Sequence, residues 1–190
     1  MAGSPFLGRQ AGFSLPDVLV ATALLAVGLI SLAQLFAVAT ANNSRARTVT
    51  FTTVLARQKM EQLRSLAWGF DPLGVPLTDV STDTASGVDA ASGGTGLSPS
   101  PTYTLRHNTS GYVDYVDGFG NILGGGATPP IGTVYVRRWS VEPLAASPND
   151  TLVLQVLATR LRDAGVIDES AAIRRYDDAR LTSVKTRKTP

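Results

Sequence analysis

An uncharged run of 24 residues constrains this chain more than any other feature. From Val18 to Ala41 the sequence holds no Asp, Glu, Lys or Arg. A helix rises 1.5 Å per residue, so the run would be about 36 Å long, enough to cross a hydrocarbon core of about 30 Å with some tilt. The pattern predicts a membrane-spanning helix near the N-terminus.

A single carboxylate, Asp17, stands at the start of this run. An unpaired charge at the centre of a bilayer costs about 3 kcal/mol, so an acid at the edge of a span points to a function and to a partner. The segment Ser14–Asp17 also has the form of a capping box, and Pro16 fits the first turn of a helix. From the residues alone, Asp17 is either a helix-start residue or a functional residue that requires a partner.

The residues Gly12-Phe13-Ser14-Leu15-Pro16-Asp17 and the apolar helix after them resemble the N-terminus of type IV pilins and type II secretion pseudopilins. These proteins carry class III signal sequences that prepilin peptidase cuts. The resemblance implies cleavage between Gly12 and Phe13, N-methylation of Phe13, and subunit docking through Asp17, which would pair with a neighbour's α-ammonium group. Two positions depart from the family: its usual acid is Glu, and its usual residue before the acid is a large aliphatic one rather than Pro16.

The resemblance also implies a division of the chain, a location and partners. Residues 1–12 would be a prepilin leader, and residues 13–41 the transmembrane and filament-core helix. The partners would be prepilin peptidase, other pilin subunits and an inner-membrane assembly platform. The precursor would be a single-pass inner-membrane protein with a periplasmic or external head, later part of a pilus or pseudopilus. The charges do not set this orientation, because Arg9 precedes the span whereas Arg45 and Arg47 follow it.

Two other interpretations of the N-terminus remain open. Ala39-Thr40-Ala41 matches the A-x-A pattern of an ordinary secretory signal peptide, which would be cut before Asn42. The apolar run is longer than the 7–15 residues usual for such a peptide. The third interpretation is an uncleaved single-span anchor.

Helical character continues over residues 42–68 as an amphipathic segment. No Gly or Pro occurs from Arg45 to Leu66, and Arg57 and Glu61 are spaced as an i,i+4 pair. The segment Leu55–Arg64 resembles the same region of V-type minor pilins and I-type pseudopilins. At 100° per residue the apolar side chains fall on one arc, opposite Arg57, Glu61 and Arg64; they are Phe51, Leu55, Ala56, Leu63 and Leu66.

The remainder predicts a flexible loop rich in Gly, Ser and Pro over residues 69–102 and an antiparallel β head over residues 103–190. The fold class is therefore α+β, with a long N-terminal helix, part membrane span and part scaffold, packed against a small antiparallel sheet. The segment Tyr135–Val141, with its Arg-Arg-Trp core, also resembles the minor pilins. The predicted strands are Tyr103–Leu105 and Tyr112–Val116 as a hairpin, Thr133–Val141, Leu152–Ala158 and Arg180–Thr186.

The residues predict no enzyme, cofactor or metal site. The chain has no Cys, and His107 is its only His. Asp114, Asp117 and Asn121 lack the spacing of an EF-hand and favour a turn. The net charge of +2 makes a nucleic-acid partner improbable. Other features favour structural roles: a flexible turn at Gly124–Gly126, packing by Tyr135 and Trp139, and a solvated basic tail at Lys185, Arg187 and Lys188.

The predicted function is therefore structural. A minor pilin processed after Gly12 and built into a type IV pilus, where it contributes to assembly, adhesion or motility, fits the residues best. A type II secretion pseudopilin is the first alternative. A membrane-anchored binding domain, such as a DNA-uptake pilin, is the second.

Overall fold

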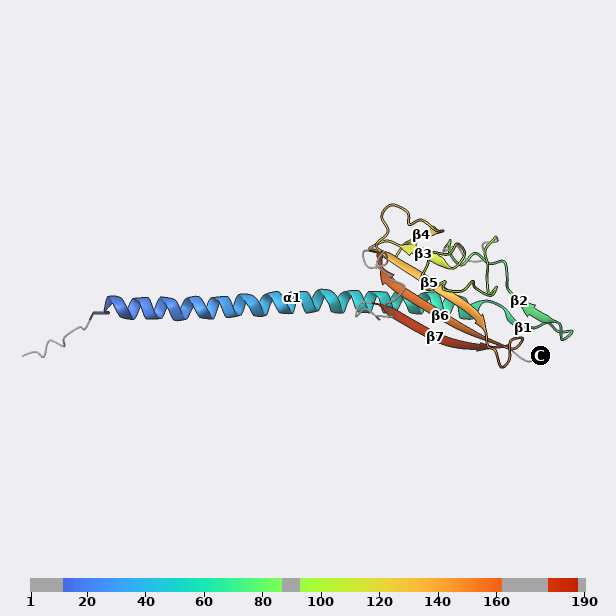
Figure 1. The fold of residues 1–190 in the computed structure, drawn as a ribbon, viewed down its shortest axis with the longest axis horizontal. Coiled ribbons are helices and arrows are strands. Elements are labelled where there is room, and N and C mark those ends of the chain that lie inside the picture. Colours follow the sequence, from blue (N-terminus) through green and yellow to red (C-terminus); the bar gives the residue numbers. More distant parts are fainter. Residues whose placement is uncertain (1–11, 87–92, 162–177, 188–190) are drawn as a thin grey trace, which may run out of the picture. The chain divides into compact units, whose positions relative to one another are not determined.

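A computed structural model describes residues 12–86, 93–161 and 178–187. Helix α1 (Leu15–Ser65) comes first, and seven strands follow it (Figure 1). The chain divides into two compact units, Met1–Ser44 and Arg45–Pro190. The predicted α+β class is confirmed. The strands are β1 (Trp68–Phe70), β2 (Pro76–Thr78), β3 (Val113–Val116), β4 (Ile122–Gly125), β5 (Tyr135–Pro143), β6 (Thr151–Arg160) and β7 (Ala179–Thr186).

Helix α1 begins two residues after the start of the predicted helical range, 13–68, and ends three residues before its end. The helix is apolar on all sides from Val18 to Ala41, and two of its hydroxyls there are bonded within the helix. Thr22 Oγ1 donates to the carbonyl of Val18 at 2.9 Å, and Ser31 Oγ donates to the carbonyl of Val27 at 2.9 Å. Such bonds satisfy these hydroxyls without water. The helix could therefore lie in lipid with those two hydroxyl groups already bonded.

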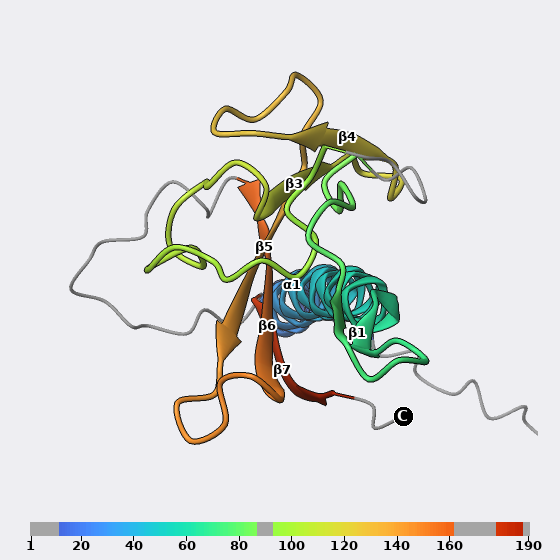
Figure 2. The same ribbon diagram turned by 90° about the vertical axis from the view of Figure 1, so that its right-hand side faces the viewer.

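The second unit packs the C-terminal part of α1 against one face of a five-stranded antiparallel sheet (Figure 2). The strand order is β4-β3-β5-β6-β7. Side chains alternate between the faces of a strand, so every second residue of β5 and β6 points to the helix. This arrangement produces one continuous core of large apolar side chains. Its members include Leu55, Ala56, Met60 and Leu63 from α1, and Trp139, Val141, Leu154 and Val156 from the sheet.

The predicted strand Tyr103–Leu105 is wrong, because this segment forms a turn. The amide groups of Arg106 and His107 both donate to the carbonyl of Tyr103, at 2.8 and 3.2 Å. Tyr103 has a φ of 63°, in the left-handed region that strands do not use. The β-forming side chains of Tyr and Thr suggested a strand, but the local hydrogen bonds favour the turn.

The hairpin partner of β3 is β4, not the segment Tyr103–Leu105. Strand β4 includes Gly124 and Gly125 from the predicted flexible turn. Glycine is a poor strand former, so no strand was predicted at these residues. A Cβ atom at Gly125 would lie 2.6 Å from the Cβ of Ala85 and 2.7 Å from the carbonyl oxygen of Val113. Glycine is required here because neighbouring chain segments approach too closely for any side chain.

The range 69–102, predicted to be one flexible loop, contains an ordered hairpin in its described part. Strands β1 and β2 pair antiparallel, with Gly69 opposite Leu77. Asp71 Oδ1 accepts hydrogen bonds from the amides of Leu73 and Val75, at 2.8 and 2.7 Å. These side-chain bonds hold a tight turn that hydrophobic periodicity alone does not indicate.

Candidate functional site

The predicted cleavage and docking residues lie together in one short exposed segment. Gly12, Phe13 and Ser14 precede α1, and the side chain of Phe13 is 94% exposed. Asp17 Oδ2 accepts hydrogen bonds from the amide of Ser14 at 3.2 Å and from its hydroxyl at 2.7 Å. The Asp17 carboxylate thus bonds the amide of the N-cap residue Ser14, as in a capping box. The Ser14 hydroxyl, however, donates a hydrogen bond to Asp17 instead of accepting one from a backbone amide. Most of the predicted leader, residues 1–11, lies outside the described residues.

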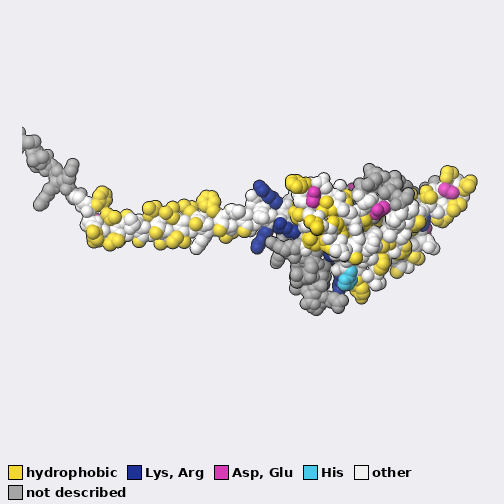
Figure 3. Space-filling view, turned by 90° about the horizontal axis from the view of Figure 1, so that it is seen from above, with side chains coloured by type: hydrophobic (Ala, Val, Ile, Leu, Met, Phe, Trp, Pro, Cys, Tyr) yellow, Lys and Arg dark blue, Asp and Glu magenta, His cyan; other side chains and the backbone are white. Residues whose placement is uncertain are grey.

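The apolar run is exposed along its length in the part of the chain that the structure describes. Helix α1 contains a window long and apolar enough to cross a membrane, and none of that window is buried. Hydrophobic side chains line this part of the helix (Figure 3). Soluble monomers seldom expose so large a continuous apolar surface. By its length and composition, this helix could span a membrane.

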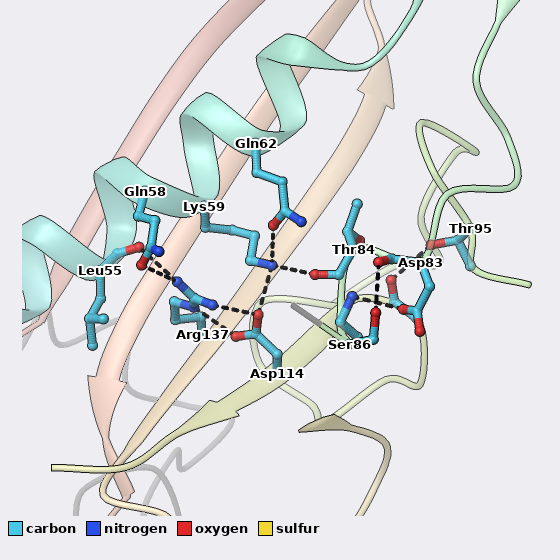
Figure 4. Close-up of polar contacts among 12 residues, drawn as sticks. Leu55, Gln58, Lys59, Gln62, Asp83, Thr84, Ser86, Thr95, Asp114 and Arg137 are labelled. Atoms are coloured by element: carbon cyan, nitrogen blue, oxygen red, sulfur yellow. Dashed lines mark hydrogen bonds and ion pairs between the residues drawn. The ribbon is translucent and has the colours of Figure 1, made fainter. Parts of the chain in front are cut away.

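A second polar feature lies in the core of the head, where three charged side chains meet (Figure 4). Lys59 comes from α1, Asp114 from β3 and Arg137 from β5. Lys59 Nζ lies 2.7 Å from Asp114 Oδ2, and Arg137 Nε lies 2.7 Å from Asp114 Oδ1. Arg137 Nη2 donates to Asp114 Oδ2 at 2.8 Å, which makes the arginine bidentate. The side chains of Lys59 and Asp114 are 0% exposed, and that of Arg137 is 1% exposed.

Neutral groups accept the remaining hydrogen bonds of the two cations. Lys59 Nζ donates to Gln62 Oε1 at 2.7 Å and to the carbonyl of Thr84 at 2.5 Å. Arg137 Nη1 donates to Gln58 Oε1 at 3.1 Å. The ring of Trp139 covers Lys59 Nζ at 4.4 Å from its centroid. We call Lys59, Asp114 and Arg137 the buried charge cluster; its formal net charge is +1.

The buried charge cluster is suited to holding elements together rather than to catalysis. Its members come from the helix and two strands, and the Thr84 carbonyl adds a fourth segment. Buried ion pairs gain little net stability over apolar packing, but they penalise any arrangement that leaves one charge unpaired. The cluster therefore fixes the position of the C-terminal part of α1 on β3 and β5.

Sequence reasoning missed this cluster, although one sign of it was present. Lys59 lies four residues after Leu55 and four before Leu63, in the middle of the apolar stripe of α1. A lysine there is either misplaced or paired inside the core. Asp114 was considered only as a turn or calcium ligand, and its partners could not be recognised without the strand register.

The other candidate residues have local structural roles. Asp117 Oδ1 accepts the amides of Phe119 and Asn121 at 2.8 and 2.9 Å, as expected for a turn. His107 is exposed. Within residues 12–86, 93–161 and 178–187, no three His, Cys, Asp or Glu side chains gather in a way that could hold a metal ion.

The basic tail is not a solvated end at the two positions that the structure describes. Lys185 Nζ donates to the carbonyls of Arg64 and Leu66 at 2.5 and 2.6 Å, at the C-terminal end of α1. The guanidinium of Arg187 stacks on Trp68 at 3.7 Å and donates to the carbonyl of Gly69 at 2.9 Å. A cation at this end of a helix satisfies carbonyls that have no partner in the helix. Lys188 lies outside the described residues.

Replacing Lys185 by Met should lower the free energy of unfolding of the head by about 1–2 kcal/mol, because the last carbonyls of α1 lose a charged donor. Urea unfolding of the full chain in detergent measures the effect. Trp68 and Trp139 are the only tryptophans, and both report on the head. The matched control is Arg57→Met, which removes an exposed cation from the same helix. Equal, small effects of the two variants would contradict the capping role.

The buried charge cluster should make the stability of the head depend on alkaline pH. Burial lowers the pKa of Lys59 from 10.5 to about 8 and the positive charge of Arg137 adds to this, while the carboxylates of Asp114 and Asp83 oppose it. Between these two values the unfolded chain binds more protons than the folded one, so the free energy of unfolding should rise with pH, by about 3 kcal/mol in all. Burial raises the pKa of Tyr112 and Tyr115, which lowers stability above about pH 10.

The measurement is the urea midpoint of the full chain in steps from neutral pH to about pH 9.5, below the tyrosine range. The Lys59→Met variant lacks the titrating group, so its profile should be flat where the unsubstituted chain rises. A midpoint that rises equally in both proteins would assign the effect to another group.

Comparison of the chain with protein-family models, with curated proteins and with solved structures finds no match. A functional interpretation therefore rests on the N-terminal residues, the uncovered apolar helix and the architecture of the head.

Proposed function

We propose that this chain is a structural subunit of a pilin-like filament, a minor pilin of a type IV pilus. The observation that carries the proposal is the uncovered apolar helix, which begins directly after Gly12, Phe13 and a single carboxylate at Asp17. The α+β architecture is compatible with it, because a small antiparallel sheet packs on the amphipathic part of the same helix.

In the proposed mechanism the membrane first covers the apolar run of the precursor. Prepilin peptidase cuts between Gly12 and Phe13, which the exposure of both residues supports, and Phe13 is N-methylated. An inner-membrane assembly platform then moves the subunit into the filament. There the helices of other subunits replace lipid around Val18–Ala41, and packing and hydrogen bonds between helices supply the attraction.

Asp17 has a specific role in this mechanism. Its carboxylate accepts two hydrogen bonds from Ser14 and none from a cation among the described residues. Cleavage would create an α-ammonium group at Phe13 of each subunit. A neighbour's ammonium group would neutralise Asp17 in the apolar filament core, where an unpaired charge costs about 3 kcal/mol.

Replacing Asp17 by Ala should lower incorporation into filaments about a hundredfold, because the α-ammonium group of a neighbouring subunit then has no charged partner. The ratio of the protein in sheared filaments to that in the membrane measures incorporation. Asp17→Glu keeps the charge and is the matched control, with incorporation at or above that of the unsubstituted chain. Normal entry of the Asp17→Ala protein into filaments would remove the docking role.

A further inference from the structure

Two arginines follow the apolar run on α1 and form no ion pair with the described part of the head. Arg45 and Arg47 are both exposed. The ion pairs of the described residues join Lys59 and Arg137 to Asp114 and Arg64 to Glu61, so neither arginine takes part in one. Glu61 thus pairs with Arg64 at 3.2 Å instead of the predicted Arg57. Among the described residues, no acid forms an ion pair with the guanidinium group of Arg45 or Arg47.

The positions of Arg45 and Arg47 match one layer of a membrane. Along a helix they follow Ala41, the last residue of the apolar run, by about 6 and 9 Å. The headgroup layer of a bilayer is about 5–8 Å thick on each side of the hydrocarbon core, and long arginine side chains adjust their reach to it. If the apolar run spans the membrane, both guanidinium groups lie at the level of the lipid phosphates.

The arrangement of the two side chains around the helix favours lipid over a protein partner. Residues two apart on a helix are separated by about 200°, so Arg45 and Arg47 point to opposite sides. One flat protein surface cannot contact both at once. Lipid headgroups surround a membrane helix on all sides, and a guanidinium binds phosphate by two hydrogen bonds.

We propose that Arg45 and Arg47 form a collar that binds the phosphate groups of anionic phospholipids. The collar holds the C-terminal end of the span at the membrane surface until the subunit leaves the bilayer. The inference rests on the part of the proposed function that places the apolar run in a membrane, and it requires neither cleavage nor filament assembly.

The test uses the full chain in vesicles that contain phosphatidylcholine and phosphatidylglycerol in both leaflets, so the orientation of the protein does not matter. The chain has no Cys, so Asn43→Cys gives a single labelling site beside the collar. Fluorescence of a label at this site is quenched by either lipid when that lipid is brominated. The ratio of quenching by brominated phosphatidylglycerol to quenching by brominated phosphatidylcholine reports which lipid is enriched there.

We expect the anionic lipid to be enriched about fivefold for each arginine, and we expect high salt to reduce the enrichment. The double variant Arg45→Gln, Arg47→Gln should lose it. The matched control is Arg57→Gln, which removes the same charge about 24 Å beyond Ala41 and should keep the enrichment. Inorganic phosphate should displace no more lipid than chloride at equal ionic strength, since the headgroups are held by the membrane.

The proposal would be overturned by equal quenching by the two lipids, by enrichment that survives in the double variant, or by equal loss with Arg57→Gln. Displacement by inorganic phosphate beyond the chloride effect would also overturn it, because it would indicate a site for free phosphate. Flotation with the vesicles separates these results from failure of the proposed function. A chain that does not float has no membrane span, whereas a chain that floats without lipid preference lacks only the collar.

Discussion

Replacing Asp114 by Ala is expected to destabilise the head by about 3–5 kcal/mol. The substitution removes the only carboxylate that bonds both Lys59 and Arg137, at 2.7 Å each, and leaves two buried cations side by side. Because a domain of this kind has a total stability of about 5–15 kcal/mol, such a loss is a large part of it. The urea midpoint of the full chain, followed by tryptophan fluorescence, measures the change.

Two further variants show whether the effect comes from the buried charge cluster. Asp117→Ala removes a half-buried turn acid three residues away and should cost about 1 kcal/mol or less. Asp114→Ala in a Lys59→Met background should cost less than in the unsubstituted chain, because only one cation loses its partner. An Asp114→Ala effect no larger than that of Asp117→Ala would contradict the role of the cluster.

Replacing Trp139 by Ala is expected to cost about 3–5 kcal/mol, because it leaves a large cavity between the helix and the sheet. Trp139 is 0% exposed and packs in the same core as the apolar residues of α1. It also covers the ammonium group of Lys59. A folded Trp139→Ala protein should therefore unfold at lower urea concentration, which circular dichroism can follow without the lost fluorophore.

Two controls separate the volume of Trp139 from its other properties. Trp139→Phe keeps most of the ring volume and should lose less than half of the stability lost by Trp139→Ala. Phe119→Ala truncates an aromatic residue that is 91% exposed and should change stability by about 0.5 kcal/mol or less. A small effect of Trp139→Ala would mean that the helix and the sheet depend little on this core.

The helix and the central strands could be predicted because their patterns are local. An uncharged run, the absence of Pro and Gly after it, and an apolar stripe define α1 from the residues alone. Strands β5, β6 and β7 are rich in β-branched, aromatic and aliphatic side chains. Their predicted bounds differ from the observed ones by at most three residues. Each of these features depends on neighbours in sequence.

The features that were missed depend on contacts between distant residues. Strand β4 contains Gly125 because Ala85 and Val113 approach it closely, and nothing next to Gly125 in the sequence shows this. Asp114 binds a lysine 55 positions before it and an arginine 23 positions after it. Lys185 reaches the end of a helix that closes about 120 residues earlier. Such pairs become visible only when the strand register is known.

The candidate functional residues show the same difference between features that are local in sequence and features that depend on distant contacts. The N-terminal residues Gly12, Phe13 and Asp17 were found because their motif is contiguous, and the structure places them together at the start of α1. Their processing and docking stay predictions. The buried charge cluster, which positions the head on the helix, was found only from the structure.

N-terminal sequencing, with the intact mass, of the membrane-associated protein tests the central claim most directly. The account predicts a chain that starts at Phe13 with a methylated α-amino group. A chain that starts at Asn42 would be an ordinary secreted protein cut at Ala39-Thr40-Ala41, and one that starts at Met1 would be a simple anchor. Either of these two results would contradict the pilin-like function.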